Sequence, residues 1–335
     1  MRVVVTGAEG QLGRDLVDAL SGRVPAAGLA GDPRTGRLGE REPCEVFPTD
    51  LPDLDITDRA DVLRMFEEVR PNVVVHGAAF TAVDACESEP DTAFAVNAIG
   101  TRNVAEAARK IEAHLVYVST DYVFDGTSSR PYIEWDTPNP VSVYGRSKYA
   151  GELECGTGDT IVRTSWVCGF HGANMVKTVL RLASSPGPLR FVVDQRGCPT
   201  FTADLAGVLA ELGCARRPGI FHVTNDGVTS WYDFARAVLA AAGDDPSRVQ
   251  PVRTAELDPP RPAPRPENSH LDNAALRLGG FGALPPWEDA LARLVKALSD
   301  ADREDTEGSS QRSSQGSSQR SSQDSSIRGS SERNR

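Results

Sequence analysis

The chain has 335 residues, with 36 basic and 47 acidic side chains, and its formal net charge at pH 7 is −11. A chain of this length is expected to form two domains, or one large domain with an added lobe. The acidic excess argues against a nucleic-acid partner, and no apolar run approaches the roughly 18 residues that a membrane span requires. Six scattered cysteines without a CxxC pair indicate reduced thiols, and we expect a soluble cytoplasmic protein.

Strands and helices alternate through the first half of the chain. The predicted strands are Arg2–Thr6, Val46–Thr49, Asn72–His76, Leu115–Ser119 and Ile161–Arg163. The predicted helices are Gln11–Leu20, Asp58–Val69, Pro90–Ile111 and Tyr144–Cys155. Continuous apolar strands that alternate with helices indicate a parallel sheet covered on both faces, which predicts a Rossmann-type, doubly wound α/β fold.

The alternation loosens beyond Ser165. Helices are predicted at Asn174–Leu182, Trp231–Ala242 and Trp287–Leu298, strands at Arg190–Val193 and Gly219–Val223, and a proline-rich connector at Asp258–Pro266. We expect a dinucleotide-binding domain over residues 1–165, to which part of the later chain returns, and a smaller substrate lobe over 166–300. The Ser-rich residues 301–335 are expected to form a disordered tail, and Ala26–Pro43 a surface loop.

A glycine-rich turn lies between the first predicted strand and the first predicted helix. Its spacing, Gly7-x-x-Gly10-x-x-Gly13, lets the backbone turn sharply and lets a pyrophosphate approach the free N–H groups of the helix. The simpler alternative is a tight connection without a ligand. An acid at the end of the second strand would read the adenosine ribose, and Asp50 fits that place, although it could be a solvated loop residue and Asp55 competes with it.

Tyr144 and Lys148 lie four residues apart in a predicted helix, so the phenol and the ammonium share one face. A nearby cation favours a phenolate, and we expect Lys148 to lower the pKa of Tyr144 toward working pH. The spacing Tyr-x-x-x-Lys is common by chance, but the glycine-rich turn upstream strengthens its interpretation as part of a catalytic site. Thr120 follows a strand and is placed to touch a substrate oxygen, unless Thr120 and Asp121 merely cap a turn.

The glycine turn together with Tyr144-x-x-x-Lys148 resembles the extended short-chain dehydrogenase/reductase superfamily, and finer features resemble its dTDP-4-dehydrorhamnose reductase branch. These features are Gln11-Leu12, Ala78–Asp84, Glu87–Pro90, Ser119–Gly126, Asn139-Pro140, Arg163–Trp166 and Asp194–Thr200. The resemblance runs from Met1 to about Leu298.

The resemblance implies residue roles. Tyr144 would give a proton to the C4 ketone oxygen of a nucleotide sugar, Lys148 would tune Tyr144 and hold the nicotinamide ribose, and Thr120 would bond the reacting oxygen. The implied contacts to NADPH or NADH are Gly7, Gly10, Gln11, Leu12, Gly13, Asp50, Asp55, Ile56, Ala78, Ala79, Thr81, Asn97, Tyr144 and Lys148. The implied substrate contacts are Thr120, Asp121, Trp166, Asn174 and Arg265.

The resemblance is less informative about metal ions. Some members bind magnesium at a dimer interface through an acid on the first helix and another just before the Asp-Gln segment. Asp15 could serve the first role, but Pro186–Arg190 supplies no acid for the second. We therefore predict no metal site, and a monomer and a homodimer both stay open.

The function implied is reduction of dTDP-4-dehydro-L-rhamnose to dTDP-L-rhamnose by hydride transfer from NAD(P)H, in deoxysugar biosynthesis. Other nucleotide-sugar 4-reductases and 4-epimerases share the same motifs. A non-catalytic regulatory subunit, like that of methionine adenosyltransferase, shares them too. Consumption of NADPH or NADH with the keto sugar would separate these alternatives.

Overall fold

The computed structural model describes residues 1–28 and 43–303. Most of the expected loop at 26–43, and residues 304–335 of the expected tail, lie outside the described residues. Residues 301–303, which the sequence analysis assigned to the tail, belong to a helix. Within the described part of the chain, no helix is long and apolar enough to cross a membrane.

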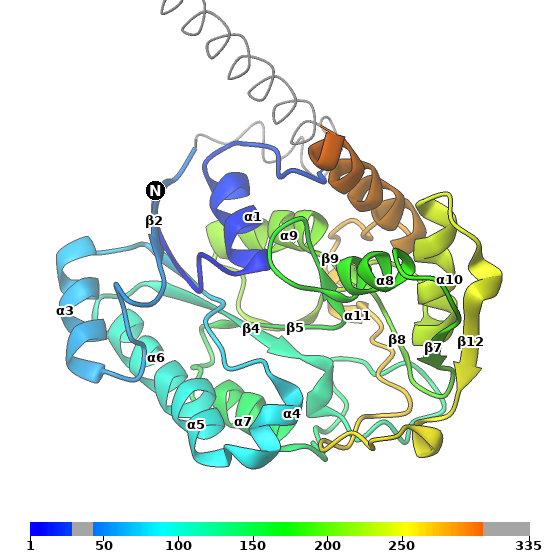
Figure 1. Ribbon diagram of the computed structural model, residues 1–335. Coiled ribbons are helices and arrows are strands. Elements are labelled where there is room, and N and C mark those ends of the chain that lie inside the picture. The colour runs from blue at the N-terminus through cyan, green and yellow to red at the C-terminus, as the bar shows by residue number, and fades with distance from the viewer. Residues whose placement is uncertain (29–42, 304–335) are drawn as a thin grey trace, which may run out of the picture.

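A six-stranded parallel sheet forms the centre of the first domain (Figure 1). Its strands, in spatial order, are β10 (Gly219–His222), β5 (Thr160–Thr164), β4 (His114–Thr120), β3 (Val73–His76), β1 (Arg2–Thr6) and β2 (Glu45–Thr49). All neighbouring strands are parallel, as the runs of valine predict. The direction in which the chain crosses the sheet reverses between β1 and β3, and ligands of such sheets bind at the strand carboxyl ends beside that reversal.

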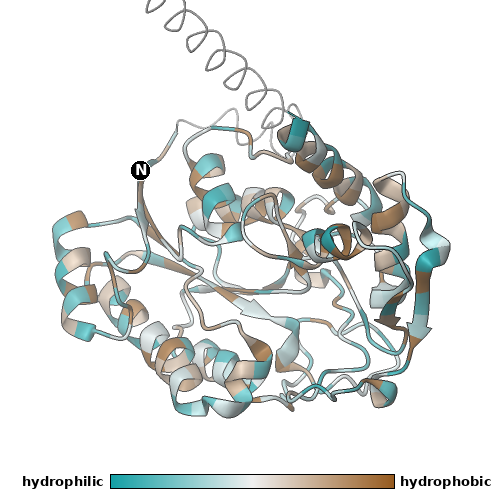
Figure 2. Ribbon diagram, viewed as in Figure 1, coloured by the Kyte–Doolittle hydropathy of each residue, from teal (hydrophilic) through white to brown (hydrophobic). Residues whose placement is uncertain are grey.

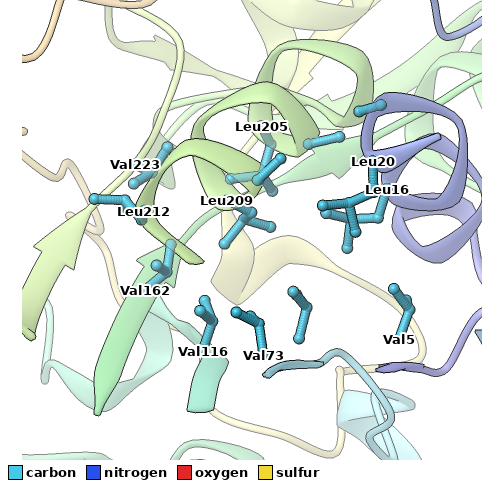
Figure 3. Packing of buried hydrophobic residues seen from close by; sticks show 14 of the residues in the cluster. Val5, Leu16, Leu20, Val73, Val116, Val162, Leu205, Leu209, Leu212 and Val223 are labelled. Atoms are coloured by element: carbon cyan, nitrogen blue, oxygen red, sulfur yellow. The ribbon is translucent and has the colours of Figure 1, made fainter. Parts of the chain in front are cut away.

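Helices cover both faces of the sheet (Figure 1). They are α1 (Gln11–Leu20), α3 (Arg59–Val69), α4 (Val83–Ser88), α5 (Pro90–Phe94), α6 (Thr101–Lys110), α7 (Val143–Glu152) and α9 (Thr202–Cys214). Because side chains alternate along β1, Val3 and Val5 pack under α1 and α9 (Figure 3), while Val4 packs on the other face with α3 and α6. The covering helices carry both hydrophobic and hydrophilic residues, as Figure 2 shows.

A second hydrophobic cluster holds the smaller lobe together. The elements of the smaller lobe are β6 (Val167–Cys168), α8 (Met175–Ala183), β7 (Leu189–Val192), β8 (Arg196–Gly197), β9 (Thr200–Phe201), β11 (Thr229–Ser230), α10 (Trp231–Ala241), β12 (Val249–Val252) and a helix at 287–303. Three two-stranded sheets result: β7 with β12, β8 with β11, and β6 with β9. Helix α11 (Ala274–Leu278) packs instead in the core of the sheet domain, beside β10. Short 3₁₀ helices lie at Asp121–Val123, Pro246–Arg248 and Thr254–Glu256.

The structure differs from the sequence prediction in several elements, since α4, α11, β12 and the two-residue strands were not predicted. The helix predicted at Pro90–Ile111 is interrupted by a π-helical segment at Ala95–Gly100, between α5 and α6. Helix α9 was not predicted, because Asp204 and Glu211 are its only charged residues, so its apolar residues do not stand out as one stripe. Both β10 and α9 belong to the sheet domain although they come late in the chain.

Candidate active site

A cavity of about 650 Å³ opens at the carboxyl ends of β1, β3 and β4. It lies at the place where the reversal of the sheet predicts a ligand. Most of the predicted site residues line it: Gly7, Gly10, Gln11, Leu12, Gly13, Asp50, Asp55, Ile56, Ala78, Ala79, Thr81, Thr120, Asp121, Tyr144, Lys148 and Trp166. The tertiary structure therefore brings together segments from the whole first half of the chain.

The glycine turn is shaped by two close backbone approaches. Gly7 has a φ of +71°, and a Cβ at Gly13 would lie 2.1 Å from the carbonyl oxygen of Gly7. Gly10 is the N-cap of α1 and has no side chain to bond the first N–H groups of that helix. Those N–H groups lie at the cavity wall, where they and the positive end of the helix dipole favour an anion such as a pyrophosphate.

Two carboxylates stand near the glycine turn. Asp50 directly follows β2, and its Oδ2 accepts a hydrogen bond from the backbone N–H of Glu9 at 2.9 Å. Asp55 lies farther along the same loop and accepts bonds from the N–H and the hydroxyl of Thr57, both at 2.8 Å. Asp50 therefore has the position and the fixed orientation expected of a ribose reader, whereas Asp55 caps its own turn.

Tyr144 lies at the first turn of α7, and its ring is partly accessible from the cavity. The side chain of Thr120 lies beside it at the cavity wall, and the Tyr144 ring packs edge-on against Tyr122 with centroids 5.6 Å apart. Burial raises the pKa of Tyr144 above its ordinary value, and the negative charge of Asp121 raises it further, while Thr120 opposes both. The phenol is therefore protonated at neutral pH and can act as an acid.

The pKa of Tyr144 is raised, so the expected lowering toward working pH was wrong, and Lys148 is not among the main groups that act on this phenol. The Nζ of Lys148 instead donates to the carbonyl oxygen of Val118 at 2.7 Å and lies 4.2 Å from the centre of the Tyr117 ring. Burial lowers the pKa of Lys148 to about 7, and the carboxylate of Glu152 acts in the opposite direction. Spacing along the helix places Lys148 near Tyr144 but does not determine where the ammonium points.

Thr120 and Asp121 join the end of β4 to the cavity. The Thr120 hydroxyl donates to Oδ1 of Asp121 at 3.0 Å and accepts from the N–H of Tyr122 at 3.2 Å. Burial raises the pKa of Asp121 to about 7, against the bonds from Ser269 and Thr120. Thr120 caps a turn, as the simpler interpretation held, yet it also reaches Tyr144.

Trp166 reaches the cavity from the smaller lobe with a strained backbone, since its φ is +46°. Its ring stacks on Trp231, with centroids 3.5 Å apart and an interplanar angle of 6°. Trp231 begins α10, and it lines the cavity although the sequence analysis did not select it. Tyr122 was missed as well. A lone aromatic residue in a sequence is indistinguishable from a core residue, so no local signal could have revealed either.

Three predicted site residues do not line the cavity. The amide of Asn97 accepts a bond from the N–H of Phe80 at 2.8 Å and donates to Ser147 at 2.9 Å, so it joins the π-helical segment to α7. Asn174 caps α8 by accepting a bond from the N–H of Lys177. Arg265 pairs with both oxygens of Asp84 at 2.9 and 2.8 Å. All three hold backbone segments or elements in place around the site.

A dinucleotide fits these residues. The glycine turn leaves room for a pyrophosphate, and the buried Oε1 of Gln11 has no hydrogen-bond partner within the protein. Asp15, by contrast, is 1% exposed and accepts a hydrogen bond from Thr202. The described residues contain no group of three or more His, Cys, Asp or Glu side chains able to hold a metal ion.

Comparison with known proteins agrees with this geometry. A family model described as the RmlD substrate binding domain matches residues 1–300. The chain is 42% identical over 307 residues to a dTDP-4-dehydrorhamnose reductase of Streptomyces griseus, which covers 89% of this chain and 94% of that one. It is 39% identical over 303 residues to the spore coat polysaccharide biosynthesis protein SpsK of Bacillus subtilis, over 90% of this chain and 99% of the relative.

A solved structure shares the fold over nearly the same length. It is the dTDP-4-dehydrorhamnose reductase of Bacillus anthracis in complex with NADP. The TM-score is 0.77 and the sequence identity 39%, over 88% of this chain and 98% of that one. The similarity therefore includes both the sheet domain and the smaller lobe.

Proposed function

The chain belongs to the RmlD substrate binding domain family, and we propose that it reduces dTDP-4-dehydro-L-rhamnose to dTDP-L-rhamnose with hydride from NADPH or NADH. The observation that carries the proposal is that Tyr144 and Thr120 line the same cavity as the glycine turn. An oriented, protonated phenol beside a dinucleotide cradle is what ketone reduction requires.

The glycine turn and the first N–H groups of α1 would hold the pyrophosphate, and Asp50 would bond the adenosine ribose. Lys148 would hold the nicotinamide ribose. When bound there, the reduced nicotinamide supplies a hydride to C4 of the sugar.

Tyr144 performs the proton transfer in this proposal. As hydride reaches C4, negative charge develops on the ketone oxygen, and the phenol donates its proton to that oxygen. Thr120 orients the phenol and adds a hydrogen bond to the same oxygen as its charge grows. Asp121, either protonated or hydrogen-bonded to Thr120, would bind the sugar nucleotide. The face of the Trp166 ring would contact it as well.

A second candidate is reduction of a different dTDP-4-keto-6-deoxysugar. The similarity to SpsK, which is named for spore coat polysaccharide synthesis, favours it at an identity close to that of the reductases. The two candidates share every step at C4 and differ only in the sugar that the cavity accepts.

The test is the loss of NADPH or NADH absorbance with purified protein and dTDP-4-dehydro-L-rhamnose, followed by identification of the sugar product. Stoichiometric cofactor oxidation and dTDP-L-rhamnose are expected. Turnover only with another 4-keto sugar would support the second candidate. Sugar conversion without net cofactor oxidation would indicate a 4-epimerase, and no conversion of any keto sugar would indicate a regulatory protein.

A further inference from the structure

An ion pair between Glu152 and Arg163 lies buried directly behind the candidate active site. Arg163 donates through Nε and Nη2 to the two oxygens of Glu152, at 2.9 and 2.7 Å, and Ser119 donates to the same carboxylate at 2.5 Å. The side chains of Arg163 and Glu152 are 2% and 3% exposed. Replacing a buried ion pair with apolar residues is often neutral or stabilising, so stability alone does not account for this one.

Two members of this buried group, Glu152 and Ser119, lie beside site residues along α7 and β4. Glu152 follows Lys148 by four positions and Tyr144 by eight, so all three lie toward one face of α7. Ser119, which bonds Glu152, stands between Val118, whose carbonyl accepts from Lys148, and Thr120, which lies beside Tyr144. Strand β4 thus contacts α7 at three successive residues, once for each of these side chains.

Glu152 is also the carboxylate that acts on Lys148. Of the other titratable groups packed around the ammonium, His76 on β3 is neutral, because burial lowers its pKa to about 3. Tyr117 on β4 and Cys155 after α7 are neutral because burial raises the pKa of each, that of Cys155 to about 12. Burial opposes the charge on Lys148, and Glu152 is the main group that favours it.

We propose that Glu152, fixed by Arg163 and Ser119, is a positioning residue that keeps Lys148 protonated and bonded to the carbonyl of Val118. Its consequence for turnover rests on the proposed function, whereas its effect on Lys148 does not. Arg163 contributes because it holds the Glu152 carboxylate in place from β5. In the parallel pairing of β4 with β5, Arg163 lies opposite Ser119. When the Glu152 charge is removed, Lys148 should therefore lose its proton at a lower pH.

The sequence makes a direct measurement practical, since it has only four lysines: Lys110, Lys148, Lys177 and Lys296. Protein labelled with carbon-13 at lysine Cε gives four side-chain signals, and Lys148→Met assigns one of them. The variant Glu152→Gln keeps the shape of the side chain and removes its charge. Its matched control is Glu154→Gln, two residues on, whose carboxylate instead pairs with Arg102 at 2.7 and 3.0 Å.

The titration midpoint of Lys148 should fall by at least about one pH unit in Glu152→Gln, which is a tenfold loss of the protonated form above that pH. It should stay unchanged in Glu154→Gln, and the signals of exposed Lys110 and Lys296 should not move in either. If Glu152→Gln does not fold, the double variant Glu152→Gln/Arg163→Met removes both charges, and the fall should keep its direction but be smaller, because the Arg163 cation is removed as well. An unchanged Lys148 midpoint in the folded variant overturns the proposal.

Kinetics test the consequence for turnover. In Glu152→Gln the basic limb of the kcat profile should move to lower pH by the same amount as the Lys148 midpoint, with kcat at low pH retained. A uniform loss of kcat at every pH would overturn a role through Lys148 and leave only a structural one. Failure of the wild-type protein to reduce any keto sugar would refute the proposed function, and the lysine titration would still decide the electrostatic part.

Discussion

Tyr144, Asp121 and Lys148 lie deep in the molecule around one cavity, and burial shifts the pKa of each toward the neutral form. The tyrosine and the aspartate thereby retain protons, while the lysine retains its own only with the help of Glu152. Burial is therefore the larger influence on the protonation of these three side chains, and specific partners are the smaller one. Single substitutions should reveal both influences.

Tyr144→Phe should lower kcat by at least about a hundredfold, because the ring stays while the proton source is lost. Cofactor affinity and melting temperature should stay near those of the wild type. Tyr149→Phe, on the same helix but outside the cavity lining, is the matched control and should retain its activity. Steady-state kinetics with a separate cofactor titration measure the effect. A near-normal kcat in Tyr144→Phe would refute the acid role.

Asp121→Asn should become more stable than the wild type as pH rises from about 4 to 7. The folded pKa of Asp121, about 7, lies above its ordinary value of 3.8, so folding favours the protonated acid, and that contribution is lost as pH rises through 7. Asp125→Asn is the control and should show no pH-dependent difference in this range, because hydrogen bonds from Thr127 and Asn139 lower the pKa of Asp125 below its ordinary value of 3.8, so its contribution is lost only at lower pH. Melting temperatures at pH 4.5 and 7.5 test both. A pH-independent difference for Asp121→Asn would contradict the assignment.

Asp50→Ala should raise the kcat/KM ratio of NADPH over NADH severalfold. The substitution removes a negative charge next to the expected 2′-phosphate and frees the Glu9 N–H that Asp50 now bonds. Asp53→Ala, on the same loop but outside the cavity lining, should leave the ratio unchanged. If Asp50→Ala also leaves it unchanged, Asp55 or another loop residue reads the ribose.

The elements around the site depend on close approaches that only glycine permits. Helix α7 begins against the 3₁₀ turn Asp121–Val123, and a Cβ at Gly145 would lie 2.2 Å from the carbonyl oxygen of Tyr122. This close contact fixes how near Tyr144 can lie to Thr120. The π-helical segment packs against the same helix through Asn97 and Ser147, so α7 is fixed from two sides.

Gly145→Ala should therefore push α7 away from the 3₁₀ turn. We expect a stability loss of about 1–3 kcal/mol, typical of overpacking, and a fall in kcat larger than the change in cofactor affinity. Gly158→Ala, where a Cβ would meet nothing within 4 Å, is the control and should have little effect. Denaturant unfolding and kinetics measure the two variants. Full activity in Gly145→Ala would mean that the position of α7 is not set by this contact.

At the scale of the whole molecule, the two lobes meet across the cavity. The stacked Trp166 and Trp231 line it from the smaller lobe. At another point, the connector at 258–266 is bound to α4 by Asp84, which accepts from Arg265 at 2.8 and 2.9 Å and from the N–H of Ala263 at 3.2 Å. Arg265 is also hydrogen-bonded to Tyr122 beside Tyr144, so this lobe contact reaches the site.

Asp84→Asn should loosen the connector and raise the KM for the sugar by about tenfold, which corresponds to about 1.4 kcal/mol. Cofactor affinity should change little, because the dinucleotide cradle lies within the sheet domain. Asp300→Asn removes an exposed pair with Lys296 and serves as the control, since exposed pairs contribute little. An increase in cofactor Kd equal to the increase in sugar KM would show that Asp84 supports the whole site instead of the lobe contact.

The sequence by itself determined the sheet and part of the site. Valine runs in alternation with helices predict the parallel sheet, and the residues of the glycine turn and of Tyr144-x-x-x-Lys148 that the motifs single out line the cavity. These signals are local: a strand, a turn or a helical spacing is encoded within a few residues, so it can be recognised before the chain folds.

Only the tertiary structure decided what those side chains contact. Helix α9 and the tryptophan stack join segments far apart in the sequence, and no spacing predicts such a contact. Asn97 and Arg265 prove to hold elements in place, and Lys148 turns to Val118 instead of Tyr144. Orientation, burial and the resulting protonation depend on which groups pack around a side chain in three dimensions, and that environment exists only once the strands and helices have assembled.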